Sequence, residues 1–363
     1  MTLNNVQHRK QLSQQILGRN GEFSAYFRFY DDLVQRNSDF HVTINSSPPL
    51  QSVTDDAVLL AAGVLRSSFS RTLEETAEHC RLVAATDHNI QFHEKALSVA
   101  LQAMFMIDPA AKENHSAEFT LGGYRPSSWK SDEALGSFID RLFPLSLGSS
   151  QEAARVAVEY RALRARKLQQ RLGARFRPTN NFAEHLLFDE KRNYLYVFHH
   201  VEFLRAQLGR YQSQADPLAV GLDKSLEQGT LPPQILVETL YTLQAVLFPP
   251  IDPGSAQILE ELIERRGFDP ECAEYEGYKV FRDPPASFQF VYWGDRMAHL
   301  HQLMTRRPPR NQLERWFNRH STEGNALFIA LLALFISILV GIVSIALNCV
   351  QIWMTWYTWK YTP

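Results

Sequence analysis

The stretch ALFIALLALFISILVGIVSIAL, from Ala326 to Leu347, decides the architecture of this chain. As a helix it would be about 33 Å long, enough to cross a hydrocarbon core of about 30 Å. The sequence stays free of charged residues on both sides of this stretch, from Gly324 to Trp359. It therefore predicts one transmembrane helix near the C-terminus.

The two flanks of this segment differ in charge. Arginines crowd the N-terminal side, opposed by Glu314, whereas only Lys360 follows. The positive-inside rule then places the long N-terminal region in the cytosol. Tryptophan and tyrosine rings on the far side would lie at the level of the lipid headgroups. The predicted membrane-interface residues are Arg306, Arg307, Arg310, Arg315, Trp316 and Arg319 before the span, and Trp353, Trp356, Tyr357 and Trp359 after it.

The position of the span also suggests a route into the membrane. Few residues follow it in this sequence, which is typical of tail-anchored proteins that are inserted after translation. The near-absence of basic residues after the span favours the endoplasmic reticulum over the mitochondrial outer membrane. We expect a single-pass membrane protein with the lipid bilayer as one partner.

Small and polar residues recur along the span at Ser337, Gly341, Ser344 and Asn348. Ser337 and Gly341 form a small-xxx-small pair, which lets two helices approach closely, and Asn348 could hydrogen-bond across such an interface. This stripe predicts self-association through the span. The alternative, an oligomeric channel, is less favoured because the stripe has no ionisable group to line a pathway.

Composition bounds the region before the span. The whole chain is 45% hydrophobic and 12% aromatic with a net charge of -2, as in globular proteins, so nothing indicates a nucleic-acid partner. The N-terminus lacks the apolar run of a secretory signal. Cys80, Cys272 and Cys349 have neither metal-site spacing nor a disulfide pattern, which fits a reducing cytosol.

Apolar residues spaced three and four apart dominate this region and predict a mainly α fold with minor short strands. The expected domains are a helical cytosolic region at 1–305, divisible near 148, a basic amphipathic juxtamembrane segment at 306–325, the transmembrane helix at 326–347 and an aromatic tail at 348–363. The predicted helical segments are Asp55–Ala85, Phe92–Met106, Glu152–Leu172, Pro232–Phe248 and Phe288–Met304, the strand candidates are Phe40–Ile44 and Phe119–Leu121, and Tyr194–Val201 is ambiguous.

Three histidines, His185, His199 and His200, are the candidate acid–base residues, because they fall in one segment and histidine titrates near neutrality. Adjacent histidines point to different faces of a regular element, so His199 and His200 are not expected to share a metal ion. Structural histidines are the favoured interpretation. Motifs for phosphate binding, zinc hydrolysis or a serine nucleophile are absent, so no cofactor or metal is predicted.

A basic stretch stands out in an otherwise neutral chain. Only Glu152 and Glu159 offset its positive charge, so it could bind anionic lipid. The alternative is a solvated helix face paired with acids elsewhere, favoured because the charges spread around the helix. Its members are Arg155, Arg161, Arg164, Arg166, Lys167, Arg171, Arg175 and Arg177.

From about residue 150 onward the chain contains a set of distinctive strings: Phe176-Arg177-Pro178-Thr179, His185-Leu186, Val197-Phe198-His199-His200, Phe203-Leu204, Leu247-Phe248-Pro249-Pro250, Gly267-Phe268-Asp269-Pro270, Tyr292-Trp293-Gly294-Asp295-Arg296 and the C-terminal span. With these strings the chain resembles a family of single-span membrane proteins of filamentous fungi for which no activity is established. The resemblance implies a fungal origin and transfers no catalytic residue. Some such proteins are encoded among secondary-metabolite genes, which implies an accessory role beside membrane-bound biosynthetic enzymes.

These observations favour a non-catalytic interaction or scaffold module, anchored by its C-terminal helix at the cytosolic face of a membrane and binding a protein partner. The alternative is an accessory enzyme that acts on a lipophilic substrate with the three histidines as acid–base groups. A deep pocket on which the rings converge would favour the enzyme, and separately buried rings would favour the scaffold.

Overall fold

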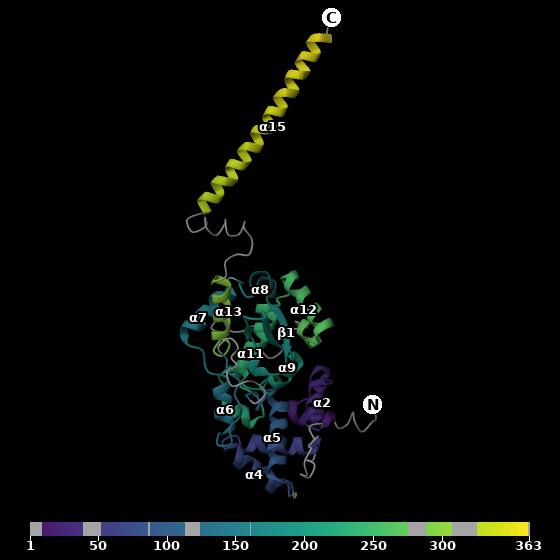
Figure 1. The fold of residues 1–363 in the computed structure, drawn as a ribbon, viewed down its shortest axis with the longest axis vertical. Coiled ribbons are helices and arrows are strands. Elements are labelled where there is room, and N and C mark those ends of the chain that lie inside the picture. Colours follow the sequence, from purple (N-terminus) through teal and green to yellow (C-terminus); the bar gives the residue numbers. More distant parts are fainter. Residues whose placement is uncertain are drawn as a thin grey trace. The chain divides into compact units, whose positions relative to one another are not determined.

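The computed structural model describes residues 9–38, 52–85, 88–112, 124–159, 161–274, 288–306 and 325–361. The chain divides into two units, Met1–Arg306 and Arg307–Pro363 (Figure 1). The first is mainly helical with one small sheet, and the described part of the second is a single long apolar helix, α15 (Asn325–Tyr361). The mainly α fold with minor strands and one C-terminal apolar helix is therefore confirmed.

Helices account for most of the first unit. They are α2 (Ser24–Ser38), α3 (Asp55–Ser67), α4 (Leu73–Ala84), α5 (Ile90–Phe105), α6 (Leu135–Leu142), α7 (Gly148–Glu159), α8 (Ala165–Leu172), α9 (Val201–Gly209), α10 (Leu222–Glu227), α11 (Pro233–Tyr241), α12 (Pro253–Arg266) and α13 (Gly294–Arg306), with π-helical turns η1 (Ser13–Leu17) and η4 (Thr242–Leu247) and 3-10 turns η2 (Phe182–Glu184), η3 (Pro217–Ala219) and η5 (Pro270–Ala273).

Two predicted helical segments are each divided in two. Within Asp55–Ala85, Thr72 starts a new helix because its hydroxyl accepts the Glu75 N–H while the Glu75 carboxylate accepts the Thr72 N–H, a capping box. Within Glu152–Leu172, α7 ends at Glu159, and Arg161 has a left-handed backbone with φ 50° before α8 begins. Side-chain capping interrupts the apolar period at Thr72, and a left-handed residue interrupts it at Arg161.

The sheet has the strand order β1-β3-β2. β1 (Arg175–Thr179) pairs in parallel with β3 (Tyr194–Phe198), and β2 (Phe188–Asp189) pairs antiparallel with β3. The ambiguous Tyr194–Val201 is thus a strand as far as Phe198, followed by His199 and His200 and then by the first residue of α9. The strand candidates Phe40–Ile44 and Phe119–Leu121 lie outside the described residues.

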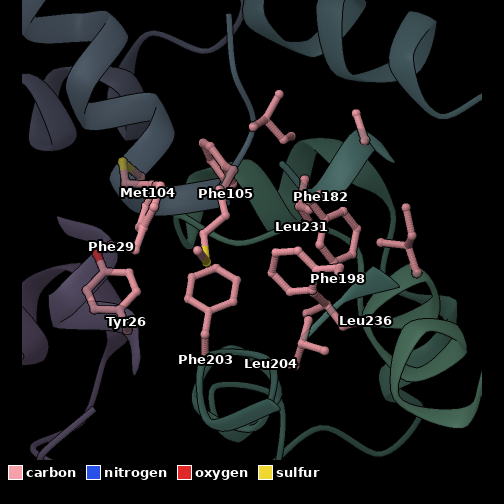
Figure 2. Packing of buried hydrophobic residues seen from close by; sticks show 14 of the residues in the cluster. Tyr26, Phe29, Met104, Phe105, Phe182, Phe198, Phe203, Leu204, Leu231 and Leu236 are labelled. Carbon is pink, nitrogen blue, oxygen red and sulfur yellow. The ribbon is translucent and has the colours of Figure 1, made fainter. Parts of the chain in front are cut away.

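One continuous apolar core joins the helices and the sheet of the first unit. Figure 2 shows Tyr26 of α2 and Phe105 of α5 facing Phe203 of α9, beside Phe198 of β3 and Phe182. The Tyr26 and Phe203 rings stack with centroids 5.9 Å apart, and the Tyr26 hydroxyl donates to the Ala103 carbonyl. This core fixes the sheet and the loops around it, where the candidate histidines lie.

Candidate functional site

His185 lies in the loop between η2 and β2 and is fully buried. Its Nδ1 accepts the Phe198 N–H at 3.2 Å, so its Nε2 carries the proton and donates to the Thr242 hydroxyl at 2.7 Å. Burial, reinforced by the nearby Arg296 guanidinium, lowers the pKa of His185 well below its usual value. The ring is neutral and both its nitrogens are occupied, which is the pattern of a structural histidine.

His199 and His200 lie between the end of β3 and the start of α9, and their rings stack with centroids 4.2 Å apart. This differs from the expectation of divergent side chains, because the pair sits at a junction and not inside a regular element. His199 Nδ1 accepts the Asp269 N–H at 3.0 Å, and His200 Nε2 meets the Asn180 Oδ1 at 2.8 Å. His200 Nδ1 is buried without a hydrogen-bond partner.

Burial lowers the pKa of both rings, that of His199 to about 3 and that of His200 well below its usual value. Aromatic neighbours surround the set: Trp293 contacts His185, Phe198 contacts His200 and Phe268 stacks on His199. None of the three histidines lines either of two surface pockets formed by described residues, one beside α10 and one between α3, α4 and α5. The rings are separately hydrogen-bonded inside the core, an arrangement that suits packing better than proton transfer to a substrate.

A buried carboxylate that the sequence did not single out lies on α11. Glu238 is fully buried, and its two oxygens accept the backbone N–H groups of Val291, Tyr292 and Trp293 at 2.7 to 3.3 Å. The Gln234 amide donates to it as well, at 2.8 Å. Burial raises the pKa of Glu238 to about 7, although these hydrogen bonds act in the opposite direction.

We call this arrangement the Glu238 clasp. It sets the start of α13, which begins at Gly294 and not at the predicted Phe288, because the three preceding N–H groups are held by the carboxylate. Trp293 adds a side-chain bond, from its Nε1 to the Thr239 hydroxyl at 2.8 Å. In the sequence, the clasp is signalled only by an acidic residue within an apolar helix. The backbone N–H groups that Glu238 accepts come from residues more than 50 positions away.

A cleft of about 460 Å³ lies between α3, α4 and α5 of the first unit. Two buried polar groups, the Cys80 thiol and the His93 imidazole, line it together with apolar residues such as Leu60 and Phe92. His93 Nε2 has no hydrogen-bond partner. Burial raises the pKa of Cys80 to about 11, so the thiol is protonated and unreactive at neutral pH.

α8 carries the middle of the basic stretch. Its buried residues are Ala165, Leu168 and Leu172, so the apolar side faces the core and the charged side faces outward. Arg166, Lys167 and Arg171 are exposed. Of the remaining members, Arg164 pairs with Asp252 at 3.8 Å, Arg155 pairs with Glu152 at 2.9 Å, and Arg161, Arg175 and Arg177 are exposed.

On α15 the described apolar side chains from Leu334 onward are uncovered. The stretch Leu334–Trp356 has a mean hydropathy of 2.3 and none of its most apolar window is buried. The stripe residues Ser337, Gly341, Ser344 and Asn348 are exposed on it, and so are Trp353, Trp356 and Trp359. This helix is long and apolar enough to span a membrane.

Most of the remaining predicted interface residues lie outside what the structure describes. Arg306 is the last residue of α13, while Arg307, Arg310, Arg315, Trp316 and Arg319 are outside the described residues, as is the side chain of Tyr357. Lys360 lies over the Trp356 ring, 4.8 Å from its centroid.

Among the described residues, no group of three or more histidine, cysteine, aspartate or glutamate side chains is placed to hold a metal ion. The chain matches no protein-family model, and no curated protein or solved structure is significantly similar to it.

Proposed function

We propose that this protein is a membrane-anchored, non-catalytic interaction module, whose helical first unit faces the cytosol and binds a protein partner. The observation that carries the proposal is the exposed apolar surface of α15 over Leu334–Trp356. In water such a surface would be strongly unfavourable, whereas a bilayer accommodates it, because the hydrophobic effect disfavours contact between apolar side chains and water.

The state of the histidines supports the non-catalytic part of the proposal. General acid–base catalysis works best with a pKa near the operating pH and with a ring nitrogen that reaches the substrate. His185, His199 and His200 are buried, and burial lowers the pKa of each. The orientation of the chain and its residence in the endoplasmic reticulum follow only from the flanking charges, and they belong to the same proposal.

Two measurements test this reading. Full-length protein should stay with membranes after alkaline carbonate extraction, and a variant that lacks residues 325–361 should not. Chemical crosslinking in intact membranes, followed by purification in detergent, should then yield a stoichiometric protein partner or a self-associated form. Full-length protein that purifies as a monomer without any crosslinked partner would overturn the interaction module.

A second candidate function, the binding of a lipophilic small molecule, is favoured by the cleft between α3, α4 and α5. Its volume of about 460 Å³ suits such ligands, and the unpartnered His93 Nε2 offers one polar contact in an apolar setting. An accessory role beside fungal biosynthetic enzymes would fit this candidate, on the resemblance of the sequence alone.

Native mass spectrometry of the full-length protein, purified from its own membrane, tests this second function. A co-purified small molecule should appear with the natural chain and be lost from Ala57→Phe, which fills the cleft from a half-buried position. Ala256→Phe, at a half-buried site on α12, is the matched control and should keep it. Binding in the cleft would be contradicted if no small molecule co-purified with the natural chain or the control. It would also be contradicted if Ala57→Phe and Ala256→Phe carried the same bound mass.

A further inference from the structure

The strongest unassigned surface of the first unit is the exposed side of α8. We call Arg161, Arg166, Lys167 and Arg171 the α8 basic face, and all four are exposed. α8 itself contains no acidic residue. Partial burial and the neighbouring guanidinium groups, first Arg164 and then Arg171, lower the pKa of Lys167. The positive charges of Arg161, Lys167 and Arg171 therefore act on one another, offset in part by Asp252, so an anion that approached them would be bound favourably.

An exposed apolar tip borders this face. Arg164 pairs with Asp252 at 3.8 Å, and the Arg166 N–H donates to Ser255 at the start of α12 at 3.2 Å. These contacts place the loop before α12 next to α8. Ile251, in that loop, has 73% of its surface exposed, and Pro250 beside it is also exposed. Basic side chains beside an exposed apolar residue are the combination that binds the headgroup layer of a membrane.

If α15 spans a bilayer as proposed, the length of the connecting chain limits how far this face can move from it. α8 packs against α13, and α13 ends at Arg306. Residues 307–324 separate it from α15, and at no more than about 3.4 Å per residue they extend at most about 60 Å. A surface tethered at such a short distance meets its target at high effective concentration, so even modest attraction suffices.

We propose that the α8 basic face docks on anionic lipid headgroups of the bilayer that holds α15, with Pro250 and Ile251 entering the interfacial layer. The inference rests on the membrane anchoring proposed above. Three basic residues near an anionic surface correspond to roughly a hundredfold change in the ratio of docked to undocked protein. Salt weakens the docking, because exposed charges are screened beyond about 10 Å at 0.1 M ionic strength.

The test uses the full chain in vesicles of phosphatidylcholine, with or without phosphatidylserine. A donor dye on Gln170→Cys, in a chain that also carries Cys349→Ser, reports energy transfer to an acceptor on the lipid headgroups. Transfer should be high with phosphatidylserine, low without it, and reduced by added salt. The triple variant Arg166→Glu, Lys167→Glu, Arg171→Glu should fall to the value seen with phosphatidylcholine alone.

The control variant Arg71→Glu, Arg125→Glu, Lys130→Glu makes the same charge change at exposed positions beside α4 and α6 and should keep high transfer. Energy transfer that is the same with and without phosphatidylserine would overturn the docking. An equal decrease of energy transfer in both triple variants would overturn it as well. Vesicle flotation separates this from the parent proposal. Protein that floats without lipid-dependent transfer refutes the docking alone, and protein that does not float refutes the anchoring.

Discussion

The inside of the first unit and the surface of α15 use the same residue types in opposite ways. In the first unit, apolar rings such as Phe198 and Trp293 are enclosed, and the buried Glu238 is surrounded by hydrogen-bond donors. In α15, apolar side chains from Leu334 to Trp356 point outward. The contrast fits water as the solvent of the first unit and, under the anchoring proposed above, lipid as the solvent of α15.

The largest effect is expected when charge is placed on α15, because this should prevent its insertion into a membrane. Val340→Arg combined with Val343→Arg should disfavour insertion by about 5 to 7 kcal/mol, since each central arginine disfavours it by about 2.5 to 3.5 kcal/mol. Carbonate extraction should move this variant to the soluble fraction. The control pair Val340→Leu and Val343→Leu should stay with the membrane. Full retention of the arginine variant would mean that α15 does not span the bilayer.

The next largest effect is expected at the Glu238 clasp. Glu238→Ala leaves three N–H groups without an acceptor, one buried at Trp293 and two partly buried at Val291 and Tyr292, so it should destabilise the first unit by about 3 to 5 kcal/mol. Its free energy of unfolding can be measured by urea titration of the full chain in detergent, followed by tryptophan fluorescence. Glu261→Ala, at an exposed site on α12, should change it by less than about 0.5 kcal/mol. If Glu238→Ala and Glu261→Ala changed the free energy of unfolding equally, the clasp would not stabilise the first unit.

The Glu238 carboxylate should also make the stability of the first unit depend on pH. Its folded pKa of about 7 lies above the ordinary value of 4.5, so the folded state binds the proton more tightly. Its contribution to stability is full below pH 4.5 and is lost as the pH rises through 7, by up to about 1.4 kcal/mol per pH unit. Glu238→Gln cannot titrate. The stability of the natural chain minus that of the variant should fall across this window, and a flat difference would contradict the pKa.

The smallest effect concerns the surface of α15 itself. Gly341 lies on the stripe, and a Cβ there would meet nothing within 4 Å in the isolated chain, so Gly341→Leu should leave the helix intact. It should weaken self-association by about 1 kcal/mol if helices pack through the stripe. Crosslinking yield in vesicles measures this, with Val340→Leu as the control. Unchanged yield in Gly341→Leu would exclude the stripe as an interface.

Helical periodicity predicted the class of the fold because it depends on residues close in sequence. It located α5 within two residues at each end, but it missed the break at Thr72, where a side-chain cap competes with the period. It also missed that Pro232–Phe248 ends in the π-helical turn Thr242–Leu247. Boundaries follow local hydrogen bonds, which hydrophobic spacing does not record.

The candidate site was less predictable for the same reason. The sequence pointed to the histidines as titratable groups, but the burial that lowers their pKa comes from rings such as Trp293 and Phe268, far along the chain. The role of Glu238 depends on backbone N–H groups that carry no residue signature at all. Chemistry fixed by long-range contacts can be identified only once the fold is known.

The Glu238 clasp also has a mechanical meaning. α13 is the last described helix before the segment that leads to α15, so any pull on the chain beyond Arg306 reaches the first unit through this helix. The pull is resisted where α13 packs against α7, and at its far end by the hydrogen bonds of Glu238. Those bonds lie at the opposite end of α13 from the load, so they are the last to be strained. The clasp thus secures the helix through which force would pass between a bilayer and the folded core.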